Sequence, residues 1–272
     1  MNTQKVALVT GASSGIGKAI AFKLIEDGLT VYVAARRVEK MQDLQQRGAI
    51  VFKMDITQDN DVKRVVEQIE NNHDGVDILV NNAGYALIGA MEDTIIEDAR
   101  RQFEVNLFGL ANLTKAALPS MRAKKFGKIV NISSLSGKIY VPFGTWYHAS
   151  KHALEGWSDC LRLELMPFNI DVIIIEPGAT KTEFPDVTLA PMMERSGNTA
   201  YSTMAKRIEQ TIKSYDEPGN ANDPSVVAEV VSQAIKARKP KTRYTAGKYT
   251  KILILMRLFL GDRIFDKIIM SL

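Results

Sequence analysis

The chain has 272 residues, of which 46% are hydrophobic, so it can bury the core of one large α/β domain or two small ones. Its 35 basic and 31 acidic residues leave a net charge of +4 without a dominant basic stripe, which argues against a nucleic-acid-binding protein. The single cysteine, Cys160, excludes an internal disulfide, and the three scattered histidines do not form a common Cys/His zinc pattern, so no metal site is predicted.

The first residues lead directly into a strand-like run at 6–10, with neither a signal-peptide apolar core nor a cleavage site. This start favours a cytoplasmic location. Cys160 itself is expected to be a small buried hydrophobe.

Apolar runs alternate with amphipathic stretches along the first two thirds of the chain. The runs predict strands at 6–10, 30–34, 50–53, 77–81, 128–133 and 170–176. The stretches between them predict helices at 15–27, 38–47, 59–71, 97–122 and 145–166, with Gly28, Gly48 and Pro167 near their ends. Such alternation predicts an α/β fold in which one doubly wound parallel sheet carries helices on both faces.

The pattern weakens after residue 178. Residues 183–222 contain three prolines and three methionines, which favours a movable lid over a substrate, with a modest helix at 200–213. A helix is expected to begin at Asp223, and a short strand should follow around 243–245. The whole chain, 1–272, is therefore predicted to be one domain that includes this lid.

Residues 247–272 form a tail with apolar residues at helical spacing. Its apolar concentration, 252–260, is too short and too interrupted to cross a bilayer. The tail is expected to pack on the domain or on a partner subunit, and a basic amphipathic helix can also lie on a membrane surface.

A glycine-rich turn follows the first strand and opens the first helix. Gly11, Gly15 and Gly17 would let the backbone approach a pyrophosphate closely, at a helix N-terminus that offers free N–H groups. A turn of this kind can also be a plain packing device, so the order strand, turn and helix carries the argument for a nucleotide site.

Two arginines follow the second strand, about twenty residues beyond the glycines. An NAD-binding domain usually has an acidic residue there, whereas arginine suits the 2′-phosphate of NADP. The sequence thus favours NADP(H), with Arg36 as the leading contact and Arg37 as the second. The alternative is that both arginines begin a solvated helix and that the cofactor is chosen elsewhere.

Tyr147 and Lys151 are four residues apart in a predicted helix, so they share one face. An ammonium group beside a phenol favours the phenolate, and the pair is therefore interpreted as an acid/base with a lowered tyrosine pKa. In isolation, such a pair would more often be a surface aromatic residue and a solvated charge.

With these features, the chain closely resembles the short-chain dehydrogenase/reductase family over nearly its first 185 residues. The motifs stand in family order: the turn at 10–17, Asp55 within 54–57, the Asn-Asn-Ala-Gly stretch at 81–84, Asn106 within 103–106, Ser134 with Tyr147 and Lys151, and 177–182. Within the family, the style of residues 147–156 and of the tail is most similar to the steroid and retinol dehydrogenase branch, and a bacterial relative of broad carbonyl specificity is the other possibility.

The resemblance implies a Rossmann-type fold and specific site residues. It implies catalytic roles for Asn106, Ser134, Tyr147 and Lys151, with Asn106 anchoring a water that links Lys151 to solvent. The implied cofactor-binding residues are Gly11, Ser13, Ser14, Gly15, Ile16, Gly17, Arg36, Arg37, Asp55, Ile56, Asn82, Ala83, Gly84, Tyr147, Lys151, Pro177, Gly178, Thr180 and Thr182.

Some serine and histidine residues near these positions are not assigned to the site. Ser134 is chosen over Ser133 and Ser136 because the family places its serine thirteen residues before the tyrosine. His148 and His152 flank the catalytic pair but are expected to be structural.

The predicted reaction is NADP(H)-dependent interconversion of a carbonyl and an alcohol, with a small lipophilic substrate. Apolar residues support such a pocket: Tyr85, Leu87, Ile88, Phe184, Val187, Leu189, Met192, Met193, Tyr201 and Met204. They could instead merely pack the lid.

Two alternatives stay open. One is a reductase of 3-oxoacyl groups on a carrier protein, for which Arg122, Lys124 and Lys125 could offer a basic docking surface. The other is a non-catalytic NADP-binding sensor or scaffold. By resemblance, the helices at 97–122 and 145–166 would pack between subunits of a homodimer or homotetramer.

Overall fold

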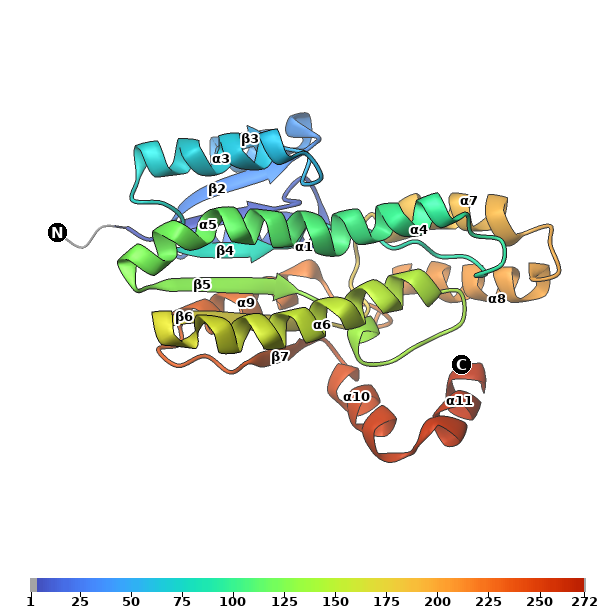
Figure 1. The fold of residues 1–272 in the computed structure, drawn as a ribbon. Coiled ribbons are helices and arrows are strands. Elements are labelled where there is room, and N and C mark those ends of the chain that lie inside the picture. Colours follow the sequence, from blue (N-terminus) through green and yellow to red (C-terminus); the bar gives the residue numbers. More distant parts are fainter. Residues whose placement is uncertain (1–3, 272) are drawn as a thin grey trace.

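The computed structural model describes residues 4–271, except for the side chains of residues 184–186 and 216. Within these residues a parallel sheet of seven strands forms the centre of the molecule, in the order β3-β2-β1-β4-β5-β6-β7 (Figure 1). The strands are β1 (Val6–Thr10), β2 (Thr30–Ala35), β3 (Ile50–Lys53), β4 (Ile78–Asn81), β5 (Gly127–Ile132), β6 (Ile170–Pro177) and β7 (Arg243–Ala246). The predicted parallel sheet is confirmed, and β7 joins it beside β6.

Helices cover both faces of the sheet. The helices that accompany the first six strands are α1 (Gly15–Glu26), α2 (Gln42–Gln46), α3 (Asp59–Asn72), α4 (Ile96–Phe103), α5 (Leu110–Lys124) and α6 (Thr145–Leu165). The later helices are α7 (Phe184–Ser196), α8 (Ser202–Lys213), α9 (Pro224–Lys236), α10 (Thr250–Phe259) and α11 (Asp262–Ser271). The fold is therefore the doubly wound arrangement expected from the sequence.

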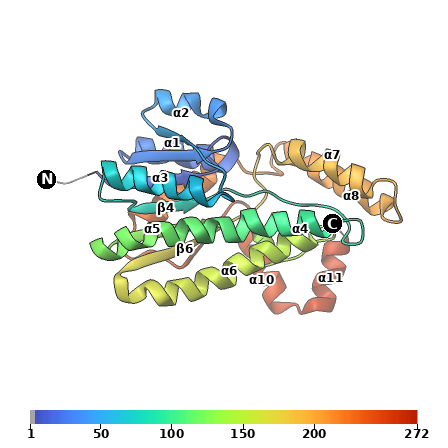
Figure 2. The ribbon, with the colours of Figure 1, turned by 45° about the horizontal axis from the view of Figure 1, so that its top comes forward.

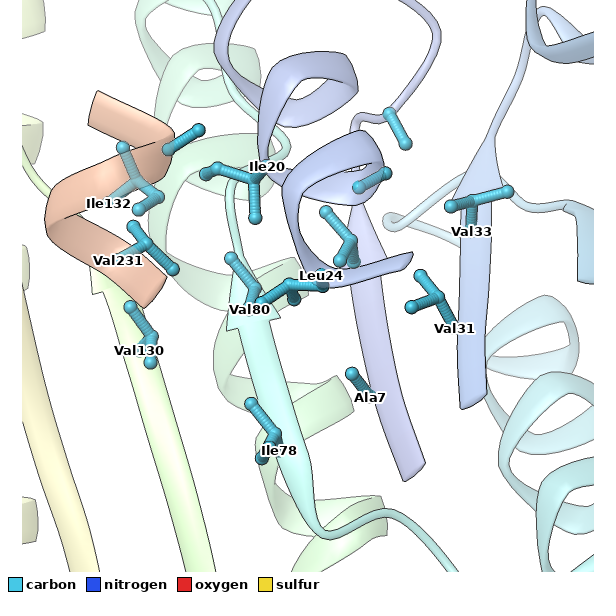
Figure 3. Packing of buried hydrophobic residues seen from close by; sticks show 14 of the residues in the cluster. Ala7, Ile20, Leu24, Val31, Val33, Ile78, Val80, Val130, Ile132 and Val231 are labelled. Carbon is cyan, nitrogen blue, oxygen red and sulfur yellow. The ribbon is translucent and has the colours of Figure 1, made fainter. Parts of the chain in front are cut away.

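Successive strand residues point to opposite faces, and each face has its own buried cluster. On one face Val80 and Val130 pack with Ile20 of α1 and Val231 of α9 (Figure 3). On the other face the strands pack against Val62 and Val65 of α3, Leu113 of α5 and Leu161 of α6. Because both faces are buried, the central strands read as continuous apolar runs, which is why the sequence reveals them.

The chain order of the strands reverses between β1 and its neighbour β4. In open α/β sheets, the loops at such a point diverge and leave a crevice at the carboxyl ends of the strands. The turn after β1 and the Asn82 loop after β4 both open there. Helices α7 and α8, which belong to the segment predicted to be a lid, project beyond the same edge of the sheet (Figure 1).

Three elements differ from the sequence prediction. The expected helix at 38–47 begins as a 3₁₀ segment, Val38–Met41, before α2. The expected helix at 97–122 is interrupted by a π-helical turn, Glu104–Gly109, between α4 and α5. Helix α7 was not predicted, because Pro191 in its interior argues against a helix, although a proline is well tolerated in a first turn.

The C-terminal tail, predicted to be helical, consists of two helices, α10 and α11. Gly261, which has φ of +67°, separates α10 from α11. This left-handed conformation is easily reached only by a residue without a Cβ atom, so the chain turns back there. Among residues 4–271, no helix combines the length and hydrophobicity needed to cross a membrane.

Candidate functional site

Two cavities meet at the carboxyl edge of the sheet. The smaller, of about 650 Å³, lies over the glycine turn, and the larger, of about 740 Å³, lies between the sheet edge, α8 and the tail. The residues that line both cavities are Ile16, Ser133, Tyr147 and Thr182. Tyr147 therefore stands at the junction, where it can reach molecules bound on either side.

Most of the predicted cofactor-binding residues line the smaller cavity. These are Gly11, Ser13, Ser14, Gly15, Ile16, Gly17, Arg36, Arg37, Asp55, Ile56, Asn82, Ala83, Gly84, Tyr147, Lys151 and Thr182. Pro177, Gly178 and Thr180 line the larger cavity instead. The structure thus brings together at one cavity residues that are up to 171 positions apart in the sequence.

The glycine turn is tightly packed against the loop after β4. Asn82 donates from its side-chain nitrogen to the carbonyl of Thr10 at 2.9 Å, and the Thr10 hydroxyl accepts from the Asn82 and Ala83 amides at 3.0 Å each. A Cβ atom on Gly17 would lie 2.3 Å from the Asn82 side-chain nitrogen and 2.5 Å from the Gly11 carbonyl oxygen. Only a residue without a side chain fits there, so the turn is both a close packing device and the floor of the cavity.

The two arginines after β2 have different surroundings. Arg37 donates to the Glu183 carboxylate at 2.8 Å and lies 3.2 Å from the Ser14 hydroxyl. Lys40 binds the other Glu183 oxygen at 2.6 Å, and these hydrogen bonds lower the pKa of Glu183 to about 2. Arg36 is exposed at the cavity and has no ion pair recorded among the described residues. Arg36 is thus the arginine that remains available to an anion.

Asp55 lies at the far side of the smaller cavity. Burial pushes its pKa up, but hydrogen bonds from the Thr57 amide (3.0 Å) and hydroxyl (2.8 Å) outweigh this effect, so the pKa is lowered. The carboxylate is therefore charged at neutral pH and can accept a hydrogen bond.

Tyr147 lies at the junction, and Ser134 lines the larger cavity. Burial raises the pKa of Tyr147, and a hydrogen bond from the Ser134 hydroxyl opposes this rise only partly. The predicted lowering of this pKa by Lys151 is therefore wrong for the protein alone, because desolvation of the phenol dominates. At neutral pH the phenol therefore carries its proton.

Lys151 is buried one helical turn beyond Tyr147. Its ammonium donates to the Ile132 carbonyl at 2.8 Å. Burial lowers the pKa of Lys151 to about 8, against the attraction of Glu155, which lies one further turn along the same helix. A lysine in this state is partly neutral at mildly basic pH.

Asn106 occupies the π-helical turn and does not belong to the residues described as lining either cavity. Its side-chain nitrogen donates to the Tyr85 carbonyl at 3.0 Å and to the Ser150 hydroxyl at 3.2 Å, and its oxygen accepts from the Tyr85 amide at 3.1 Å. Ser150 in turn donates to the Tyr147 carbonyl at 2.8 Å. Asn106 thus ties the loop after β4 to the helix that carries Tyr147, and π-turns are frequent at functional sites.

The larger cavity is mainly apolar. Its aliphatic and aromatic lining comes from the loops (Ile88, Ile139, Val141), from α8 and its end (Met204, Ile208, Ile212, Tyr215) and from the tail (Leu253, Ile269, Met270). Arg207 is the sole charged residue among the lining residues that the structure describes. Cavities of this size and character suit small lipophilic ligands.

Of the apolar residues predicted to form this pocket, Ile88, Tyr201 and Met204 line it. Met192 is fully buried, with Leu189 and Met193 packed beside it in a separate small core, so these residues pack α7 rather than line the larger cavity. Leu87 is buried, and Tyr85 and Val187 line the smaller cavity. The side chain of Phe184 lies outside the described residues.

The remaining sequence expectations have mixed outcomes. His148 has its Nδ1 2.7 Å from the Ile139 carbonyl, and His152 has its Nδ1 2.9 Å from the His148 carbonyl, so both rings have structural contacts. The prediction that Cys160 is buried is wrong. The buried side of α6 runs through Leu154, Ser158 and Leu161, and Cys160 falls off that stripe.

The sequence does not predict the ionic cluster that forms around Glu155, one helical turn after Lys151. Glu155 binds Lys138 at 2.7 Å and Arg243 at 3.0 Å, and Glu176 lies 3.5 Å from the same guanidinium. The spacing of Glu155, four residues after Lys151, was the available signal; its partners come from distant elements. Among the described residues there is no group of His, Cys, Asp and Glu side chains that could hold a metal ion.

Comparisons with known proteins agree with this geometry. The family model described as short chain dehydrogenase matches residues 5–190. A 3-ketodihydrosphingosine reductase of Bacteroides thetaiotaomicron is 35% identical over 92% of this chain and 90% of its own length. An NADPH-dependent 3-dehydrocapnine reductase of Ornithobacterium rhinotracheale is 34% identical over 97% of this chain and 95% of its own length.

The solved structures include similar folds. A short-chain dehydrogenase from Streptomyces avermitilis superposes with a TM-score of 0.82 at 33% identity, covering 94% of this chain and 93% of the other.

Proposed function

The chain belongs to the short-chain dehydrogenase family, and on that premise we propose that it uses NADP(H) to reduce the carbonyl of a lipophilic, long-chain ketone. The family assignment itself makes the protein an oxidoreductase that uses a nicotinamide cofactor and acts on an alcohol or a carbonyl. The observation that carries the finer proposal is that Tyr147 lines both cavities, one with the glycine turn and several charged side chains in its lining and the other mainly apolar.

The residues of the smaller cavity fit a dinucleotide. The turn floored by Gly11 and Gly17 leads into the N-terminus of α1, where free N–H groups suit a pyrophosphate. Arg36 would hold the 2′-phosphate, because it is exposed at the cavity while Arg37 is engaged by Glu183. Asp55 would accept from the adenine, and Lys151 would bind the nicotinamide ribose.

Bound NADPH would supply the hydride. Ser134 and Tyr147 would hydrogen-bond the substrate oxygen, and Tyr147 would donate its proton to that oxygen during reduction. The raised pKa of Tyr147 keeps this proton available, and the Lys151 ammonium would stabilise the phenolate that remains. Asn106 would act as a positioning residue through Tyr85 and Ser150.

We expect the rate of reduction to fall as the pH rises above about 8. Burial lowers the pKa of Lys151 to about 8, so above this pH the amine loses the charge that stabilises a phenolate. The value of kcat/KM, which reports groups of the free enzyme, should be level below about pH 7 and then decline. Lys151→Arg, which keeps its charge, should retain a level profile to higher pH, even at a lower rate. A profile that is flat or rising to pH 9.5 in the unmodified protein would contradict this role of Lys151.

A long-chain ketone fits the apolar lining of the larger cavity. The two relatives described above are named as reductases, and 3-ketodihydrosphingosine is itself a long-chain ketone. The side chains of Ile208 and Ile212 from α8 face the cavity together with Leu253 from the tail, so a chain bound there would be covered on several sides.

The function is tested by measuring NADPH oxidation with a series of 3-ketones of increasing chain length. Burial of one methylene contributes about 0.8 kcal/mol, so kcat/KM should rise by up to about fourfold for each added methylene until the cavity is full. Equal rates along the series would contradict the proposal that the substrate is lipophilic. If no ketone, aldehyde or quinone causes NADPH oxidation, the proposal that the protein is a reductase is wrong.

The cofactor part of the proposal is tested in the same assay. Arg36→Ala should raise the KM for NADPH by about ten- to hundredfold, because a hydrogen bond to a charged group contributes about 1.5–3 kcal/mol. The KM for NADH is the internal control and should stay within about twofold. Equal changes for both cofactors would show that Arg36 does not read the 2′-phosphate.

The basic cluster Arg122, Lys124 and Lys125, predicted as a docking surface for a carrier protein, is far from the cavities in the fold. Lys124 binds the Asp77 carboxylate at 2.6 Å, and Arg122 lies over the Phe168 ring, at the end of α5 that precedes β5. Strand β5 begins there, so the basic cluster lies at the amino edge of the sheet, opposite the two cavities. None of its three residues lines either cavity, so the cluster does not support this alternative.

We further propose a homodimer or homotetramer and a cytoplasmic location. Large apolar side chains are exposed on and beside the long helices, among them Phe108, Leu163 and Met166. Burial of these side chains between subunits would remove them from water.

A further inference from the structure

The tail helices α10 and α11 form a hairpin (Figure 2), and α10 contacts the edge strand β7. They lie on the same side of the molecule as the mouth of the larger cavity, which residues of both helices help to line. The reaction chemistry described above does not use this hairpin.

The hairpin is held to the body by one aromatic anchor. Phe265 of α11 is fully buried and stacks edge-to-face on Tyr140 at 5.4 Å between ring centroids. Arg257 lies over the Tyr140 ring at 5.0 Å, and the Tyr140 hydroxyl donates to the Asp266 carboxylate at 2.8 Å. These contacts fix the position of the hairpin, so its outward surface is a defined feature of the protein.

The outward surface of α10 is apolar. Ile252, Leu255 and Phe259 are spaced three and four residues apart, so they share one face, and Leu258 lies next to them. Leu258 is 70% exposed and Phe259 is 76% exposed, and Ile264 of α11 is also exposed. Contiguous exposure of this kind marks a contact surface.

The tail also carries an excess of basic side chains. Residues 248–271 contain five basic and two acidic side chains, a net charge of +3. Lys248, Lys251, Arg263 and Lys267 are exposed and have no ion pair recorded among the described residues. An apolar face with free Lys and Arg residues complements a bilayer surface that carries anionic headgroups.

The same hairpin borders the substrate cavity. Leu253 of α10 and Ile269 and Met270 of α11 line it, and Met270 is also 47% exposed. Met270 is therefore at the boundary between the cavity and the outside. A ligand that leaves an apolar environment at the hairpin would enter the cavity without first crossing bulk water.

We propose that α10 and α11 dock the protein on an anionic membrane surface and pass a membrane-resident ketone into the larger cavity. The hairpin would lie in the interface, with Leu258 and Phe259 among the acyl chains and the four free basic residues at the headgroups. The second part, delivery of substrate, depends on the lipophilic substrate proposed above; the docking itself does not.

The experiment measures sedimentation of the full chain with vesicles, without substrate or cofactor. Vesicles of phosphatidylcholine with one quarter phosphatidylglycerol should bind the protein, and pure phosphatidylcholine vesicles should bind it several-fold more weakly. The double variant Leu258→Glu/Phe259→Glu should bind at least tenfold more weakly, because two large apolar side chains no longer enter the lipid. Neither residue lines a cavity, so turnover of a short, water-soluble ketone should stay unchanged.

The matched control is the double variant Ile95→Glu/Ile96→Glu, which places the same two charges on adjacent side chains that are 61% and 46% exposed at the start of α4, outside the tail. It should bind vesicles as the unmodified protein does. Docking is overturned if the unmodified protein ignores anionic vesicles, or if the control loses binding as much as the double variant. Light scattering gives a further test of docking. If the unmodified protein is an oligomer that does not bind vesicles, and the double variant is a monomer, then the apolar face binds a second copy of the chain and docking is overturned. If the protein binds vesicles but reduces no ketone, the docking proposal stands and the proposed function is contradicted.

Discussion

Tyr147→Phe is expected to lower kcat for carbonyl reduction by about 10²–10⁴-fold, the usual contribution of a positioned general acid. Tyr147 lines both cavities, its phenol is hydrogen-bonded by Ser134, and burial raises its pKa so that the proton is present at neutral pH. Phenylalanine keeps the ring but removes the proton that we propose Tyr147 donates to the substrate oxygen. The measurement is steady-state NADPH oxidation with the best ketone of the series.

Tyr201→Phe is the matched control for this substitution. Tyr201 lines the same larger cavity, but its hydroxyl donates to the Glu92 carboxylate at 2.8 Å at an exposed position. Its removal should change kcat by no more than about twofold. Cofactor affinity, followed by fluorescence titration, should be nearly the same in both variants. If Tyr147→Phe keeps more than a tenth of the activity, another group supplies the proton.

Gly17→Ala is expected to weaken both the fold and the binding of cofactor. The added methyl group would lie 2.3 Å from the Asn82 side-chain nitrogen and 2.5 Å from the Gly11 carbonyl oxygen, so the turn after β1 or the loop after β4 must shift. Overpacking of this kind costs about 1–3 kcal/mol, which corresponds to a fall of several degrees in the melting temperature. Because the shifted backbone is the floor of the smaller cavity, cofactor affinity should fall at least tenfold.

Gly156→Ala provides the comparison for the second substitution. Gly156 lies within α6, and a Cβ atom there would have no neighbour within 4 Å. The same chemical change should therefore leave cofactor affinity unaltered and raise stability slightly, since alanine favours a helix by about 1 kcal/mol over glycine. Thermal melts with and without cofactor give both quantities. Equal behaviour of the two variants would show that the turn can open without cost.

Local patterns in the sequence were sufficient to predict most of the sheet and the glycine turn. The bounds of β1 and β3 agree with the predicted runs at 6–10 and 50–53. Strand β1 is buried on both faces and therefore appears as an apolar run. Strand β3 lies at the edge of the sheet and is partly exposed, and its three apolar residues still mark it. Helix α6 begins at the predicted residue and ends one residue early. These features depend on neighbours in the chain, which a sequence displays directly.

Features that depend on distant parts of the chain were not predictable. Glu183 binds Arg37 across 146 positions, and no local pattern marks that pairing. The tail residues Leu253 and Ile269 line the larger cavity only because the hairpin folds back on the body. The pKa of Tyr147 is raised, whereas the sequence predicts a lowered value. Burial causes the rise, and the depth of burial is a property of the folded protein.

The π-helical turn at Glu104–Gly109 limits the deletions and insertions that this part of the gene can tolerate. One extra residue in a helix rotates everything before it by about 100° relative to everything after it. This offset lets Gln102 bind the Leu87 amide at 2.6 Å while Leu113 stays buried against the sheet. An in-frame loss of a single codon here would restore regular winding but swing Gln102 and Asn106 away from the loop they hold. We therefore expect related genes to keep the length of this stretch constant, even where its composition drifts.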